Sequence, residues 1–154
     1  MIFLRRSSLA CPYFVPLEIL NDGSWQHPAR LPLGAGWSGS CCATEHPSTP
    51  DASTLHDLCN LGNAVACPHL PRERDWDAVR FSIARDGSAQ ITLWYVCELE
   101  YAPVEHGKLF FDRPSERWLN LHSDPRLQRL ADCYLKTYRA GQNENRGLPE
   151  GAIA

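Results

Sequence analysis

The apolar positions in the second half of the chain follow a period of two, beginning at Ala78. Two alternating runs, 78–84 and 91–99, are separated by an Asp-Gly pair of the kind found in turns. This pattern predicts a β-hairpin with one apolar face. The residues that alternate toward that face are Val79, Phe81, Ile83, Ile91, Leu93, Tyr95, Cys97 and Leu99.

The length of the hairpin loop decides which residues of the two strands face each other. A three-residue loop at 85–87, with its glycine in the left-handed conformation, would pair Phe81 with Ile91 and Val79 with Leu93. A one-residue slip would put apolar side chains on both faces, so we predict the three-residue loop.

A third strand and a helix are predicted after the hairpin. The segment 102–107 is expected to form a loop, and 108–112 a strand that completes a three-stranded antiparallel meander. An Asp-Pro pair then starts a helix over 124–140, which Gly141 ends. Its apolar stripe should cover one face of the meander and consists of Leu127, Leu130, Ala131, Tyr134, Leu135 and Tyr138. Trp94 should lie on the outer face, either under a helix or in a protein-docking surface.

The first half of the chain lacks such a period. From Cys11 to about Pro50 it is rich in proline, glycine and tryptophan, so we expect an ordered coil. A coil of this length needs something other than a hydrogen-bonded ladder to hold it in place. A short helix is predicted at about 50–61, because a Thr-Pro-Asp sequence starts it and Gly62 can end it.

These elements predict a single domain of the α+β class over 1–141, since 154 residues suit one core. It comprises a cysteine-bearing coil and short helix (11–70), a three-stranded antiparallel meander (78–112) and a C-terminal helix (124–140). The polar, aperiodic segment 142–154 is expected to be a tail.

Charge and hydropathy narrow the functional classes. The formal net charge is −3 and the basic residues are scattered, so we expect no nucleic-acid partner. No stretch approaches the roughly 18 apolar residues of a membrane span, and the short apolar run at the start precedes its arginines, opposite to a signal peptide. We therefore expect a cytoplasmic protein without membrane insertion, in which seven cysteines indicate metal binding or catalysis.

Position separates the cysteines into two groups. Cys97 and Cys133 fall on the second strand and the last helix, where free cysteine is most simply a core residue. Cys41 and Cys42 are adjacent and project differently, so one should be spare. The Gly-Ser pair before Cys41 lets the chain bend round a centre there and favours Cys41, with Cys42 as the alternative. The predicted metal ligands are Cys11, Cys41, Cys59 and Cys67.

The spacing of these ligands favours an iron–sulfur cluster. Between successive ligands lie 29, 17 and 7 residues, whereas structural zinc sites use short paired knuckles. A cluster, expected to be [4Fe-4S], accepts thiolates from separated segments, and the two Cys-Pro pairs are similar to the ending of ferredoxin motifs. Zinc is the alternative metal. His46 and His69 lie nearest to cysteines but are left out of the ligand set, and Trp25 and Trp37 are expected to shield the centre.

Three segments, Cys11-Pro12-Tyr13-Phe14, Trp37-Ser38-Gly39-Ser40-Cys41 and Cys59-Asn60-Leu61-Gly62-Asn63-Ala64 followed by Cys67, carry a resemblance. In them the chain is similar to an uncharacterised group of small bacterial four-cysteine proteins. The resemblance covers the first half and continues through Asp77-Ala78-Val79-Arg80-Phe81. It implies a four-cysteine site at the same positions and no established activity.

The sequence therefore predicts an iron–sulfur protein that acts in electron transfer or as an accessory subunit of a redox complex, with a protein partner. One alternative is a non-enzymatic adaptor module with a structural zinc ion. The other is a thiol enzyme, with Cys42 or Cys59 as nucleophile and His46 or His56 as base. We expect that the chain is not an enzyme by itself.

Overall fold

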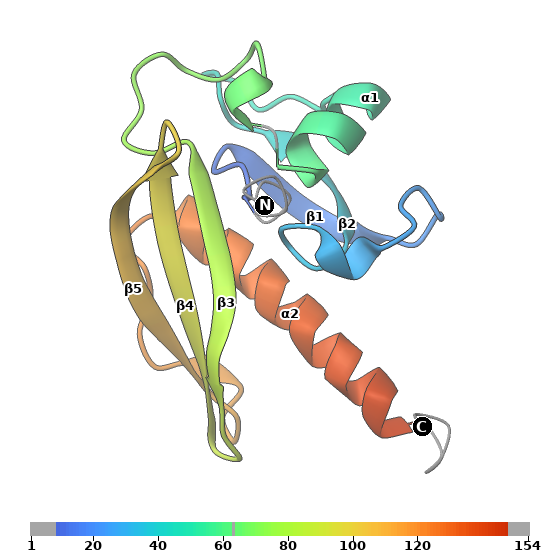
Figure 1. Cartoon of the computed structure of the whole chain (residues 1–154), viewed down its shortest axis with the longest axis vertical. Helices are drawn as coiled ribbons and strands as arrows, with labels where there is room; N and C mark the ends of the chain where they lie inside the picture. The colour runs from blue at the N-terminus through green and yellow to red at the C-terminus, as the bar shows by residue number, and fades with distance from the viewer. Residues whose placement is uncertain (1–8, 63, 148–154) are drawn as a thin grey trace.

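The computed structural model describes residues 9–62 and 64–147, the last five of them by their backbone alone. In chain order the elements are β1 (Phe14–Leu20), η2 (Pro28–Arg30), β2 (Gly36–Cys41), α1 (Ala52–Thr54), η3 (Leu55–Asn60), η4 (Ala64–Ala66), β3 (Ala78–Asp86), β4 (Gln90–Leu99), β5 (Ala102–Asp112), β6 (Arg117–Trp118) and α2 (Pro125–Gly147). They form two antiparallel sheets, β1–β2 and β3–β4–β5–β6. The predicted α+β class is confirmed, and Figure 1 shows how its parts are arranged.

The predicted three-stranded meander is wrong, because the sheet has four strands. β5 begins at Ala102 instead of 108, and β6 adds a short fourth strand. The early part of β5 contains a proline and a glycine, which is why its sequence predicts a loop. Pro103 pairs where the β4–β5 register shifts, and a Cβ on Gly107 would lie 2.6 Å from the Tyr95 hydroxyl oxygen. Pro103 therefore lies at a bulge in the strand, and Gly107 lies where the Tyr95 side chain approaches the backbone closely.

The β3–β4 hairpin is confirmed, but its predicted register is wrong. Phe81 faces Tyr95 and Val79 faces Cys97, four residues further along β4 than expected. The loop lies at 87–89 and is closed by the Gly87 N–H, which donates to the Gln90 carbonyl at 2.8 Å. A bulge in β3 precedes it, between Ile83 and Arg85. A shift by an even number of residues keeps every side chain on its predicted face.

The predicted N-terminal coil is also wrong in part, because it contains the β1–β2 hairpin. The sequence pattern did not indicate these strands, because they contain glycine and proline, which are typical of loops. Pro16 lies at an irregularity of the β1–β2 register. A Cβ on Gly39 would come within 2.2 Å of the Val15 carbonyl oxygen, so the two strands approach closely there.

The helix predicted at 50–61 is present as α1 followed by the π-helix η3. It begins at Ala52, because Asp51 is the N-cap and its carboxylate accepts a hydrogen bond from the Thr54 N–H at 2.8 Å. It ends, as predicted, before Gly62, which has a left-handed φ of +82°.

The last helix starts where it was predicted and runs further. The Asp124 carboxylate accepts a hydrogen bond from the Arg126 N–H at 2.9 Å and so caps α2. The helix passes Gly141, where an added Cβ would meet no atom within 4 Å, and continues to Gly147, the last residue that the structure describes. The first part of the predicted tail, 142–147, is therefore helical, and 148–154 lies outside the described residues.

The core is formed where α2 meets both sheets. One cluster of buried side chains joins the β1–β2 hairpin, β3, β4, β5 and α2, and includes Phe14, Trp37, Val79, Leu93, Leu109, Leu127 and Leu130. Cys97 and Cys133 belong to it, as the sequence predicts, with exposed fractions of 0% and 2%. Trp94 is 44% exposed and lies on the face of β4 opposite to its neighbours Leu93 and Tyr95, which belong to this cluster. Among the described residues, no helix has the length and apolar character needed to cross a membrane.

Asp86, at the end of β3, ties the β3–β4 hairpin to α2. Its carboxylate accepts a hydrogen bond from the Tyr138 hydroxyl at 2.6 Å, and further ones from Arg113 and Gln142. The Tyr138 hydroxyl above all, together with Arg113 and Gln142, holds the pKa of Asp86 below its usual range. The folded state therefore favours the charged carboxylate more strongly than the unfolded state does.

This difference predicts a pH dependence of stability. Because the pKa of Asp86 is lower in the folded state, its contribution is present above the ordinary aspartate pKa of about 4 and is lost as pH falls through the folded value. Asp86→Asn should lower the free energy of unfolding by about 1 kcal/mol at neutral pH. Urea denaturation at several pH values should show this deficit shrinking in acid, and a deficit that is constant with pH would contradict the assignment.

Candidate metal centre

The four cysteines singled out by the sequence line one pocket with apolar walls. They come from four separate segments: Cys11 precedes β1, Cys41 ends β2, Cys59 lies in η3 and Cys67 follows η4. The remaining wall residues are Tyr13, Phe14, Ala43, Thr54, Leu58, Ala64, His69 and Leu70. The fold therefore brings together thiols that are far apart in the sequence.

Backbone hydrogen bonds fix two of these cysteines on the sheets. Ala10 forms a bridge with Val79 of β3, with N···O distances of 2.8 and 3.0 Å, and so places the adjacent Cys11. Cys41 forms a similar bridge with Ser48, at 2.7 and 3.0 Å. Both thiols are thus attached to paired backbone instead of to a free loop.

Asn60 attaches the third cysteine segment to β2. Its side chain accepts a hydrogen bond from the Trp37 N–H at 2.9 Å and donates to the Trp37 and Leu55 carbonyls at 3.0 Å each. The residue is 3% exposed, so these bonds are shielded from water. Because Cys59 is its neighbour, Asn60 holds the Cys59 segment of η3 against the strand that carries Cys41.

The thiols influence one another electrostatically. Burial raises the pKa of Cys59 to about 12, and the neighbouring Cys41 and Cys67 add to the increase. Burial likewise raises the pKa of Cys11 to about 12, with contributions from Cys59 and Cys41. Both thiols therefore favour the neutral form in the absence of a neighbouring positive charge.

Cys11 has donors that favour its ionised form. Backbone N–H groups of Tyr13 and Phe14 lower its pKa against the larger effect of burial. In a cysteine-ligated centre, backbone N–H groups that donate to sulfur stabilise the thiolate and tune the metal. The Cys-Pro-Tyr-Phe turn, closed by the Phe14 N–H and the Cys11 carbonyl at 3.2 Å, thus presents a sulfur with donors already in place.

Of the adjacent Cys41 and Cys42, only Cys41 lines the pocket. Cys42 does not line the pocket, and its N–H donates to the Tyr13 carbonyl at 2.8 Å. His69, which the sequence placed near a cysteine but outside the ligand set, is part of the pocket wall, whereas His46 is not.

The tryptophans do not shield the pocket as expected. Trp25 stacks on His56, with ring centroids 4.7 Å apart, and Trp37 is buried in the core, so neither lines the pocket. Tyr13, Phe14, Leu58 and Leu70 cover it instead. The signal for these residues is their place beside the cysteines, since Tyr13 and Phe14 follow Cys11 closely and Leu58 precedes Cys59.

The arrangement of the cysteines can be compared with that of known metal centres. All seven cysteines are free. Within the described part of the chain, no three His, Cys, Asp or Glu side chains are arranged to hold a metal ion. Four thiols that share a pocket are nevertheless the donor set of both structural zinc and iron–sulfur centres, so the residues fit such a group in kind. Comparisons with protein-family models, curated proteins and solved structures found no match for this chain.

Proposed function

We propose that the protein binds an iron–sulfur cluster, of the [4Fe-4S] type, through Cys11, Cys41, Cys59 and Cys67. The observation that carries this proposal is the pocket that these four thiols share although they come from four segments. Cysteine thiolates are the usual ligands of such clusters. The other wall residues are mostly apolar, which limits the access of water to the centre.

A cluster is favoured over a single zinc ion by the wide spacing of the four cysteines along the sequence. A tetrahedral zinc site holds four donors at about 2.0–2.3 Å from one ion and usually takes them from short paired knuckles. A cubane is larger and its ligands stand further apart. The absence of a short cysteine knuckle in the sequence agrees with this preference.

The place of the pocket suits electron transfer. Cys67 and Leu70 are partly exposed and His69 is exposed, so one side of the pocket lies at the surface. A cluster there would be within tunnelling reach of a docked protein. The protein is therefore proposed to relay electrons to a protein partner, or to be an accessory subunit of a redox complex, in the reducing cytoplasm where thiols persist.

A thiol enzyme finds less support in the same geometry. A nucleophilic cysteine needs a lowered pKa, whereas burial raises the pKa of both Cys59 and Cys42. His56, one proposed base, stacks on Trp25 and contacts Asp57 at 2.8 Å and the Ser24 carbonyl at 3.2 Å. It is thus engaged away from the cysteine pocket.

Anaerobic purification followed by absorption spectroscopy and metal analysis tests the proposal. The expected result is a brown protein with about four iron and four sulfide per chain, whose visible absorption bleaches on reduction with dithionite. A colourless protein with about one zinc and no sulfide would overturn it in favour of the structural zinc module. A protein that binds neither metal after reconstitution would also refute it.

A further inference from the structure

Arg126, in the first turn of α2, is a cation held against the wall of the candidate centre. The central carbon of its guanidinium lies 4.7 Å from the centroid of the Tyr13 ring and 5.0 Å from that of the Trp76 ring. Tyr13 is itself a wall residue of the cysteine pocket. One residue, Tyr13, therefore both lines the pocket and carries the guanidinium on its ring.

Asp124 fixes the position of this cation. The guanidinium donates from Nε to Oδ1 at 3.1 Å and from Nη2 to Oδ2 at 2.7 Å. The Arg126 and Asp124 side chains are only 28% and 24% exposed, so water and salt screen the pair incompletely. The charge of Arg126 thus has a defined place beside the pocket.

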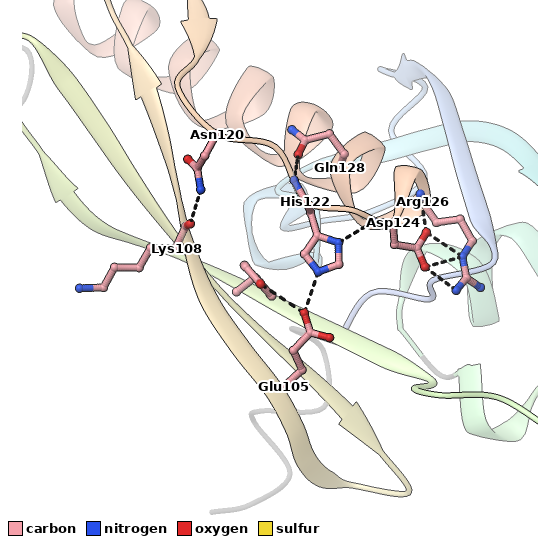
Figure 2. A network of polar contacts seen from close by, with 8 residues as sticks. Glu105, Lys108, Asn120, His122, Asp124, Arg126 and Gln128 are labelled. Carbon is pink, nitrogen blue, oxygen red and sulfur yellow. Dashed lines mark hydrogen bonds and ion pairs between the residues drawn. The ribbon is translucent and has the colours of Figure 1, made fainter.

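A chain of polar contacts anchors this ion pair to the main sheet (Figure 2). The Asp124 N–H donates to His122 Nδ1 at 2.9 Å, and His122 Nε2 lies 2.7 Å from a carboxylate oxygen of Glu105 on β5. The same oxygen accepts a hydrogen bond from the Tyr95 hydroxyl on β4 at 3.2 Å. The start of α2 is therefore held by both strands.

We propose that the Arg126–Asp124 pair sets the reduction potential of the cluster, an inference that rests on the proposed function. Reduction adds one electron to a centre that its four thiolates already make negative. A nearby positive charge stabilises the reduced form and a nearby negative charge destabilises it. Arg126 therefore raises the potential, and Asp124 lowers it as well as holding Arg126.

Two variants of the full chain test this inference by potentiometric titration under anaerobic conditions. Arg126→Gln should make the midpoint potential more negative, because the cation is removed while Asp124 remains. Asp124→Asn should make it more positive, because asparagine still caps the helix but carries no charge. Arg126→Lys is the matched control, since it keeps the charge without the planar contact with two rings and should retain a potential close to that of the wild type.

Opposite shifts from the two variants are a result that a structural role would not produce. Unchanged potentials, or shifts of the same sign, would overturn this inference and leave the cluster in place. Iron and sulfide analysis of the wild type comes first, and a zinc centre there would overturn the proposed function and this inference together. If Arg126→Gln fails to fold, the shift in Asp124→Asn alone decides, and thermal unfolding of each variant shows whether it is folded.

Discussion

Replacing Cys41 by serine should remove the iron and sulfide from the protein, whereas replacing Cys42 should leave both in place. Cys41 lines the pocket with the other three cysteines, and Cys42 does not. A serine oxygen is a harder and less readily ionised ligand than a thiolate, so it binds iron–sulfur clusters poorly. The same change at two adjacent positions should therefore have opposite results.

The measurement is the iron and sulfide content of each variant after anaerobic purification, with its visible absorption. Because metal binding supplies folding energy, the Cys41→Ser protein should also unfold at lower temperature than the Cys42→Ser protein. Equal loss from both variants would contradict the assignment of Cys41. Loss from Cys42→Ser alone would establish Cys42 as the ligand.

Asn60→Ala should cause a large loss of stability. It removes three hydrogen bonds and leaves the Trp37 N–H and carbonyl without these partners in a buried place. Buried backbone groups that lose their partners cost the desolvation energy of each group, so the free energy of unfolding should fall by about 3 kcal/mol. The Cys59 segment would lose its attachment to β2 as well.

Asn120→Ala is the matched control for this substitution. Asn120 also bonds two backbone groups, the Phe110 N–H at 2.8 Å and the Lys108 carbonyl at 2.9 Å, as Figure 2 shows in part. It is exposed, so water can replace these bonds, and the expected loss is about 1 kcal/mol or less. Chemical denaturation of both variants without metal separates the two effects. Losses of equal size would contradict the role given to Asn60.

Local signals in the sequence were sufficient for the elements that have a clear period. The β3–β4 hairpin and the start of α2 follow from alternation and from the Asp124 cap, and the burial of Cys97 and Cys133 follows from their place in these elements. The register of the hairpin did not follow, because the loop lies two residues further along the chain than expected and β3 contains a bulge that its alternating pattern does not reveal.

The strands missed by the sequence analysis share one cause. Pro16, Gly39, Pro103 and Gly107 all lie in strands, at bulges or at close approaches of two chain segments. Proline and glycine in a short window indicate a loop, and only the neighbouring strand explains their presence. Information of this kind is tertiary, so no pattern within 1–50 or 102–107 could have supplied it.

The candidate site was more accessible to sequence reasoning than its surroundings were. Grouping Cys11, Cys41, Cys59 and Cys67 required only their types, their spacing and the exclusion of core cysteines, and the structure places them in one pocket. That they bind a cluster remains a prediction. Arg126 was not predicted, because it lies more than 50 residues beyond the last of these cysteines and reaches the pocket wall through Tyr13.

The bridge between Ala10 and Val79 has a consequence for the order of events during synthesis. Cys11 takes its place through the backbone bonds of the adjacent Ala10 to β3, and β3 is itself held by β4. The first cysteine therefore has a fixed position only when the chain as far as Leu99 is present and paired, although all four cysteines lie within the first 67 residues. Insertion of the proposed cluster should accordingly follow the formation of β3 and β4, and a fragment that stops before β3 should fail to retain it.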